Sequence, residues 1–236
     1  EIAAQIMSKY DFSVVPVVDR EKRLVGIITF DDALDVMEDE ASEDIAKMSA
    51  VTPTDKPYLK TTVIETWKAR IPWLLLLMIS ATFTGMIITS FETALASYVV
   101  LTAYIPMLMD TGGNSGSQAS VTVIRGISLG DIEFSDLPQV IWKEARVAVL
   151  CGATLSAANF VKLILLDRVG MAVALVVSLT LLVTVIVAKA VGCTLPILAK
   201  KAGFDPTVMA SPFITTIVDA ISLFIYFTIA THLLGL

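Results

Sequence analysis

The last apolar run of the chain reads PTVMASPFITTIVDAISLFIYFTIATHLLGL (Pro206–Leu236), and one acidic residue, Asp219, lies near its middle. The run exceeds the ~20 residues that a helix needs to cross a bilayer. A carboxylate at that depth costs several kcal/mol in hydrocarbon, so Asp219 should face water, a cation or a partner. Thr215 and Thr216, four and three positions earlier, extend a polar stripe along the same helical face.

Two interpretations of Asp219 follow from this position. The carboxylate either lines a water-filled ion path, or it pairs privately with a basic residue such as Lys189. We favour the ion path, because the neighbouring hydroxyls continue the polar stripe.

The composition is that of a membrane protein. Hydrophobic residues make up 56% of the chain, well above the usual share of a soluble domain. Residues 1–70 hold 14 acidic and 9 basic side chains, whereas residues 71–236 hold only 9 and 8. We therefore expect a short charged region followed by a membrane-embedded one. Because the chain opens on Glu1 in what reads as mid-domain, we also expect it to be part of a longer protein.

The scarcity of histidine and cysteine limits which metals the chain can bind and which enzyme reactions it can catalyse. One histidine and two separated cysteines, Cys151 and Cys193, cannot build a typical zinc or copper site, so oxygen ligands must hold any metal. The sequence has no nucleophile–base constellation, and an enzyme is not expected. A nucleic-acid partner is not expected either.

Five membrane spans are predicted from the apolar runs. They are Ile71–Phe91, Ala94–Ile124, Val140–Leu166, Met171–Leu198 and Thr207–Leu236. Lys and Arg gather on one side of these spans, which predicts a cytoplasmic N-terminus and an outside C-terminus. The basic residues on the predicted cytoplasmic side are Lys56, Lys60, Lys68, Arg70, Arg125, Lys143, Arg146, Lys200 and Lys201.

The second span contains the unusual segment PMLMDTGGNSGSQAS (Pro106–Ser120). We expect its proline and glycines to break the helix and free backbone carbonyls, which is tolerated only beside protein or a water-filled cavity. Such carbonyls, with Asn114 and Ser117, would be hard oxygen ligands for Mg²⁺ or Ca²⁺. The alternative is a small-residue helix-packing face. The two interpretations are compatible.

Magnesium is favoured among the hard cations. It sheds water reluctantly and is usually held by one or two carboxylates. An odd number of spans leaves no even internal duplication, so a symmetric pore would need a second copy of the chain. Two copies of Asp219 would then face one hydrated ion.

Residues 1–50 have a different pattern. The β-branched runs Val14–Val18 and Leu24–Ile28 flank a polar turn and predict a β-hairpin. A helix is predicted from about Asp31 to Met48, with apolar residues at spacings of three and four. Its other faces carry eight acidic residues within Asp31–Asp44 and no basic residue before Lys47. This surface is either simply solvated or binds divalent cations, and we favour cation binding.

Two stretches carry a resemblance to known families. Phe12–Asp19 (FSVVPVVD) and Leu24–Asp32 (LVGIITFDD) resemble the second half of a cystathionine-β-synthase (CBS) domain. The acidic helix, the basic connector and five spans containing GGNSGSQ (Gly112–Gln118) and a mid-span Asp resemble the MgtE-type magnesium channel family.

This resemblance implies a fold and a set of domains. The fold is a membrane all-α domain of five transmembrane helices, preceded by a partial α/β CBS domain and an acidic connecting helix. The implied boundaries are residues 1–32 for the partial CBS domain, 33–60 for the acidic plug helix and connector, and 61–236 for the pore. The implied setting is a homodimer in a prokaryotic inner membrane, with the pore lined by the second and fifth spans.

The resemblance also assigns residues. The pore positions, which would hold Mg²⁺, are Asp219, Asn114, Gly113, Ser117, Thr215, Thr216 and Asp205. The plug-helix positions, where cytosolic Mg²⁺ would close the pore, are Asp32, Asp35, Glu40, Glu43 and Asp44. Phe12, Thr29 and Asp32 fit the pattern with which CBS domains hold ATP.

Two function classes remain. The first is a Mg²⁺-selective channel that is closed by its own substrate, with other divalent cations as further candidate substrates. The second is a transporter in which Asp219 takes up a proton or Na⁺ coupled to movement of a divalent ion.

Overall fold

The structure, a computed structural model, describes residues 2–235, and the side chains of all of these except residues 93–95 and 211. It divides into two compact units. The first comprises residues 1–47 and 51–69, and the second comprises residues 48–50 and 70–236. Each unit is described by itself.

The first unit is a small α/β structure. Helix α1 (Ile2–Tyr10) precedes strands β1 (Val14–Val18) and β2 (Leu24–Thr29), which pair antiparallel with Val14 opposite Thr29. The turn is held by Asp19, whose carboxylate accepts hydrogen bonds from Arg23 N at 2.8 Å and Arg23 Nε at 3.0 Å. These bonds, led by the one from the Arg23 backbone, lower the pKa of Asp19. The predicted hairpin is therefore confirmed, whereas α1 had not been predicted.

Helix α2 (Phe30–Met48) follows the hairpin directly and confirms the predicted acidic helix. Its buried residue is Ala33, which packs with Ala4 and Met7 of α1 in a small core. The predicted apolar stripe is present, but its large members Leu34, Met37 and Ile45 are exposed. The first unit thus covers only the start of α2. A short 3₁₀ turn η1 (Tyr58–Lys60) leads on to α3 (Val63–Ser90).

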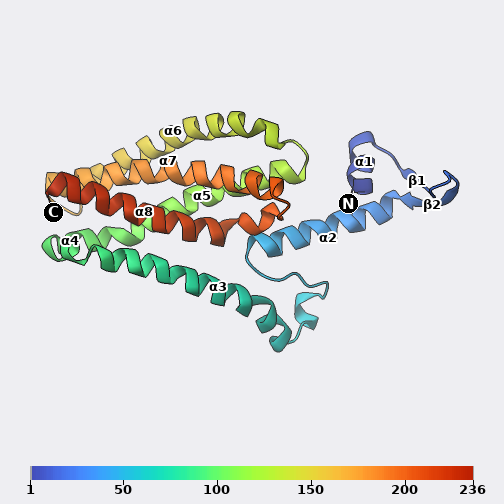
Figure 1. Ribbon diagram of the computed structural model, residues 1–236, viewed down its shortest axis with the longest axis horizontal. Coiled ribbons are helices and arrows are strands. Elements are labelled where there is room, and N and C mark those ends of the chain that lie inside the picture. Colours follow the sequence, from blue (N-terminus) through green and yellow to red (C-terminus); the bar gives the residue numbers. More distant parts are fainter. Residues whose placement is uncertain (1, 236) are drawn as a thin grey trace. The chain divides into compact units, whose positions relative to one another are not determined.

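The second unit is helical. After α3 come α4 (Glu92–Ser97), the 3₁₀ segment η2 (Val99–Tyr104), α5 (Ile105–Ser128), η3 (Phe134–Asp136), α6 (Leu137–Leu165), α7 (Met171–Lys201), η4 (Pro206–Met209) and α8 (Ser211–Leu234). Helix α7 packs against α5, α6 and α8, and α5 also packs against α8 (Figure 1). These four helices form a bundle with α7 as its central element.

The bundle is held by close packing and by polar contacts between helices. Its main core includes Leu108 of α5, Leu181 of α7 and Phe227 of α8. Ser156 of α6 donates a hydrogen bond to the carbonyl of Ser178 of α7 at 2.6 Å. In a bilayer such contacts drive helix association, because lipid is as apolar as the helix surfaces.

In the part of the chain that the structure describes, four helices are long and apolar enough to cross a membrane: Val63–Ser90, Phe134–Leu165, Met171–Lys201 and Pro206–Leu234. They correspond to the first, third, fourth and fifth predicted spans. Helix α5 is not among them, since its glycine, serine and amide side chains make it too polar. A total of five spans therefore stays a prediction.

The second predicted span does not have the predicted shape. We expected the proline and glycines to break it, and at the glycines this prediction is wrong. Helix α5 runs without interruption from Ile105 to Ser128, with Pro106 in its first turn. Proline fits there because the first helical N–H groups need no partner within the helix. The break comes earlier, in the short elements α4 and η2.

Candidate functional site

The glycines of α5 are packing residues. A Cβ atom on Gly113 would lie 2.8 Å from Thr215 Cγ2 of α8, and one on Gly116 would lie 2.7 Å from Ile214 Cγ2. A Cβ atom on Gly112 would lie 2.7 Å from Thr184 Cγ2 of α7. Only hydrogen fits at these positions, so the glycines bring α5 close to both α7 and α8. The small-residue packing face is confirmed, and the expected free carbonyls are absent because the helix is continuous.

This close approach sets the surroundings of Asp219 on α8. Its Oδ1 atom is buried and has no hydrogen-bond partner within the described residues. Asp110 lies on α5, a helix that packs against α8. One turn before Asp219 along α8 lies Thr215, which contacts Gly113. Two carboxylates from neighbouring helices, one with an unsatisfied oxygen, attract cations.

The private ion pair considered for Asp219 is not observed. Lys189 of α7 is only 5% exposed, and its Nζ lies 4.0 Å from Glu144 Oε2 of α6. The basic residue considered as the partner of Asp219 is therefore paired with another carboxylate. Glu144 was not predicted as a partner. Its position in the first turns of an apolar helix was the available signal.

Helix α5 presents polar side chains on a second face. Asp110, Asn114 and Gln118 follow one another at intervals of four residues, and all three are exposed in the single chain. Ser117 is half-buried beside them. The structure thus places Asn114 and Ser117 on the same helix as Gly113. Asp110 was not assigned to the site from the sequence, although its spacing of four from Asn114 would have revealed it.

The remaining predicted pore residues have local roles. Thr216 Oγ1 donates a hydrogen bond to the carbonyl of Pro212 at 3.0 Å. Asp205 caps η4, because its Oδ1 accepts hydrogen bonds from Thr207 N at 2.9 Å and Thr207 Oγ1 at 2.5 Å. A capping carboxylate of this kind needs no ion to explain it.

The predicted regulatory residues all lie on α2. Glu43 Oε1 is paired with Lys47 Nζ at 2.5 Å, one turn along the helix. Asp32 accepts a hydrogen bond from Thr29 Oγ1 at 2.6 Å, and Asp35 is exposed. Glu40 and Asp44 also have interaction partners. Within residues 2–235 no three acidic, histidine or cysteine side chains are grouped closely enough to hold a metal ion.

Of the three predicted nucleotide residues, the structure brings two, Thr29 and Asp32, into contact. The Thr29 side chain is bound to Asp32, and Phe12 is about half exposed. The Phe12 ring stacks on Tyr10, with centroids 5.7 Å apart and planes inclined by 26°. Tyr10 was not predicted. Its spacing of two from Phe12 was the signal that sequence reasoning missed.

Comparison with known proteins adds to this geometry. The MgtE family, described as divalent cation transporter, matches residues 105–229, which include α5, α6, α7 and most of α8. The CBS domain family matches residues 1–39. The chain is 40% identical over 238 residues to the magnesium transporter MgtE of Thermus thermophilus, a match that covers 99% of this chain and 52% of that protein.

Two further relatives bear the same name. The magnesium transporter MgtE of Bacillus subtilis is 35% identical, with 98% of this chain and 51% of the relative covered. That of Enterococcus faecalis is 31% identical, with 98% and 50% covered. The chain spans about half the length of the curated relatives it matches. Since the family match covers more than half of the chain and nearly all of the helix bundle, the chain belongs to the MgtE family of divalent cation transporters.

Proposed function

We propose that this chain contributes the ion-conducting domain of a Mg²⁺ channel, with Asp219 of α8 as the carboxylate that attracts the ion. The observation that carries the proposal is the buried Oδ1 of Asp219, which has no hydrogen-bond partner among the described residues. Its helix α8 packs against α5, which carries Asp110. Mg²⁺ keeps most of its water and needs only one or two carboxylates. The relatives named above are magnesium transporters.

The pore is formed between two copies of the chain. Helix α5 has 24 residues and is about 36 Å long, enough to cross a bilayer as a fifth span. Its exposed face holds Asp110, Asn114 and Gln118, which are costly against lipid. A second copy that packs around the same axis would turn this face to water. The ion would then meet Asp219, Asn114 and Ser117 from both copies, with Gly113, Thr215 and Thr216 shaping the wall and Asp205 near one end.

A dimer also gives α3 a partner. No residue in the most apolar stretch of α3 is buried in the single chain, and Trp73 of α3 meets Phe213 of α8 edge-on at 6.3 Å between ring centroids.

We place the N-terminus in the cytoplasm of a prokaryotic cell and the C-terminus outside its inner membrane. The domain boundaries we propose are residues 1–32, 33–60 and 61–236.

Helix α2 is the gate in this proposal. Asp32, Asp35, Glu40, Glu43 and Asp44 lie on one helix, and their mutual repulsion falls when Mg²⁺ binds. Because one chain groups no three of these side chains around a metal position in its described part, closure needs carboxylates from a second surface. ATP is proposed to bind at Phe12, Thr29 and Asp32, because the Phe12 ring is exposed and the Thr29 hydroxyl is held by Asp32.

A coupled transporter is the second candidate. Two carboxylates on neighbouring helices, Asp219 of α8 and Asp110 of α5, are also compatible with uptake of a proton or Na⁺. Other divalent cations, such as Mn²⁺ and Co²⁺, remain candidate substrates in either case.

Mg²⁺ flux through the full-length parent in liposomes separates the two. Flux that follows the Mg²⁺ gradient and the voltage, without dependence on a pH or Na⁺ gradient, supports the channel. Strict dependence on either gradient supports coupling.

The dimeric pore is tested with Asn114→Cys, which should cross-link two copies, and with Val149→Cys on an exposed face of α6 as the control. Equal cross-linking of both variants would contradict the proposed axis.

A further inference from the structure

A cavity lies at the end of the helix bundle where α5 ends, α6 begins and α7 ends. Its volume is about 260 Å³, and it is lined by Ile127, Ile132, Glu133, Phe134, Ile197, Lys200 and Lys201. Ile127 and Ile197 belong to the small core that joins α5 to α7, with Ile132 packed against it. The floor of the cavity is therefore apolar, and one rim is basic.

The basic rim has no acidic partner. Lys201 Nζ lies over the ring of Phe134, 3.5 Å from its centroid, which fixes the ammonium group at the mouth of the cavity. Among the described residues no carboxylate forms an ion pair with Lys200 or Lys201. Two neighbouring cations without partners attract an anion.

The carboxylate in the lining is already engaged. Glu133 and Asp136 form a reciprocal capping box at η3, in which each side chain accepts a hydrogen bond from the other's backbone N–H. The Asp136 carboxylate accepts from Glu133 N at 2.9 Å. These bonds hold the Glu133 side chain at the η3 turn, and no ion pair among the described residues joins it to either lysine.

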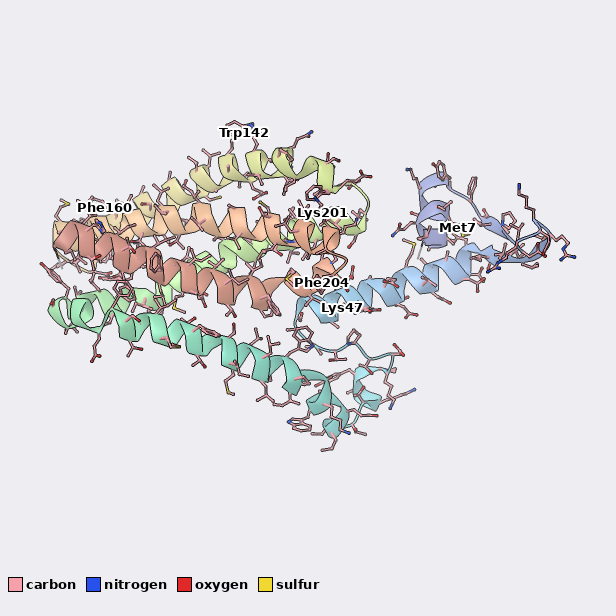
Figure 2. The ribbon with its side chains drawn as sticks, in the orientation of Figure 1. Met7, Lys47, Trp142, Phe160, Lys201 and Phe204 are labelled. Carbon is pink, nitrogen blue, oxygen red and sulfur yellow. The ribbon has the colours of Figure 1, made fainter. Side chains whose placement is uncertain are left out.

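The surroundings are those of a membrane–water boundary. Lys200 and Lys201 end α7, a helix long and apolar enough to cross the membrane. Trp142 on α6 is 65% exposed, and Arg146 lies over its ring at 5.7 Å. Figure 2 shows Trp142 on the outer side of α6 and Lys201 at the end of α7. Exposed tryptophan and snorkelling basic residues are typical of the headgroup region.

We propose that this cavity binds an anionic phospholipid. The phosphate lies between the ammonium groups of Lys200 and Lys201, and an acyl chain covers Ile127, Ile132 and Ile197. A soluble anion would use the lysines but would leave the isoleucine floor exposed to water. A lipid satisfies both parts of the lining, and it is present at this depth wherever α7 spans a bilayer. The site is separate from Asp219 and does not depend on the proposed ion path.

The test is lipid binding to the full-length parent purified in detergent, measured by native mass spectrometry. The probes are dioleoylphosphatidylglycerol and dioleoylphosphatidylcholine. We expect preferential binding of phosphatidylglycerol, weakened about 30-fold by the double substitution Lys200→Gln with Lys201→Gln, since each lysine near a phospholipid contributes about fivefold. The control is Lys143→Gln, an exposed lysine of α6 outside the lining, which should leave the preference unchanged.

Three outcomes would overturn the proposal. The first is equal affinity for the two lipids in the unsubstituted protein, which would mean that a polypeptide segment covers the cavity or that nothing binds there. The second is an equal loss in Lys143→Gln, which would indicate diffuse surface attraction. The third is full competition by inorganic phosphate at the concentration of the lipid, which would make the site one for a soluble anion. Size-exclusion profiles and circular dichroism of each variant report whether it remains folded.

Discussion

Gly192 of α7 lies directly against the backbone of Gly116 of α5, so that a Cβ atom on Gly192 would be 2.2 Å from the Gly116 carbonyl oxygen. No side chain fits at that distance, and the obstacle is backbone that cannot rotate away. We expect Gly192→Ala to push α5 and α7 apart and to cost about 1–3 kcal/mol of stability. Thermal unfolding in detergent should show a clearly lower midpoint.

The matched control is Gly85→Ala on α3, where nothing lies within 4 Å of the added Cβ. Alanine favours helix over glycine, so this variant should be neutral or slightly more stable. Equal midpoints for the two variants would mean that the α5–α7 approach is looser than described.

Asp219→Asn should abolish most Mg²⁺ flux while the protein remains folded. The amide keeps the shape of the side chain but removes the charge that attracts a dication, and within residues 2–235 the buried Oδ1 has no hydrogen bond to lose. Flux into liposomes loaded with a Mg²⁺-sensitive dye measures the effect. Wild-type flux in this variant would exclude Asp219 as the ion's carboxylate.

Asp205 separates a pore role from a capping role. If its carboxylate only caps η4, Asp205→Asn should keep both stability and flux, because asparagine caps as well as aspartate. Asp205→Ala should lower the stability by about 1 kcal/mol, since the Thr207 N–H loses its acceptor. A large loss of Mg²⁺ flux in Asp205→Asn, at unchanged stability, would return this residue to the ion path.

The local pattern of residues along the sequence was enough to predict much of this fold. The hairpin before α2 and the acidic helix itself follow from β-branched runs, a polar turn and helical spacing, and both are confirmed. Helix α5 shows where local pattern fails. Its glycines predict a broken helix if the chain is considered alone, yet α7 and α8 pack against them and the helix stays continuous. The pairing of Lys189 with Glu144 likewise joins two helices and has no signal in the spacing of either residue.

The Glu144–Lys189 pair should behave as a buried ion pair. Removing one partner leaves an uncompensated charge inside the bundle, at a cost of about 3–5 kcal/mol. We expect Lys189→Met alone to be strongly destabilised, and Lys189→Met combined with Glu144→Gln to recover part of the loss. Thermal unfolding is measured for Lys189→Met, for Glu144→Gln and for the double variant, which together form a double-mutant cycle. A double variant whose loss equals the sum of the single losses would show that the two groups do not interact.

If the protein is the channel proposed above, the acidic face of α2 should make it sensitive to cytosolic Mg²⁺. At low Mg²⁺ the carboxylates repel one another and any acidic surface they face, and this repulsion disfavours the closed state. At millimolar Mg²⁺ bound ions remove the repulsion. The ion then favours the closed state because it binds that state more tightly than the open one. Changing Glu40, Glu43 and Asp44 together to their amides removes both the repulsion and the ligands. The expected result in patch recordings of the full-length parent is therefore a loss of Mg²⁺ dependence, without a fixed direction of activity.

Asp19→Asn is the control, because this carboxylate lies in the hairpin turn and is bound to Arg23. An unchanged inhibition curve in the triple variant would place the Mg²⁺ sensor outside α2.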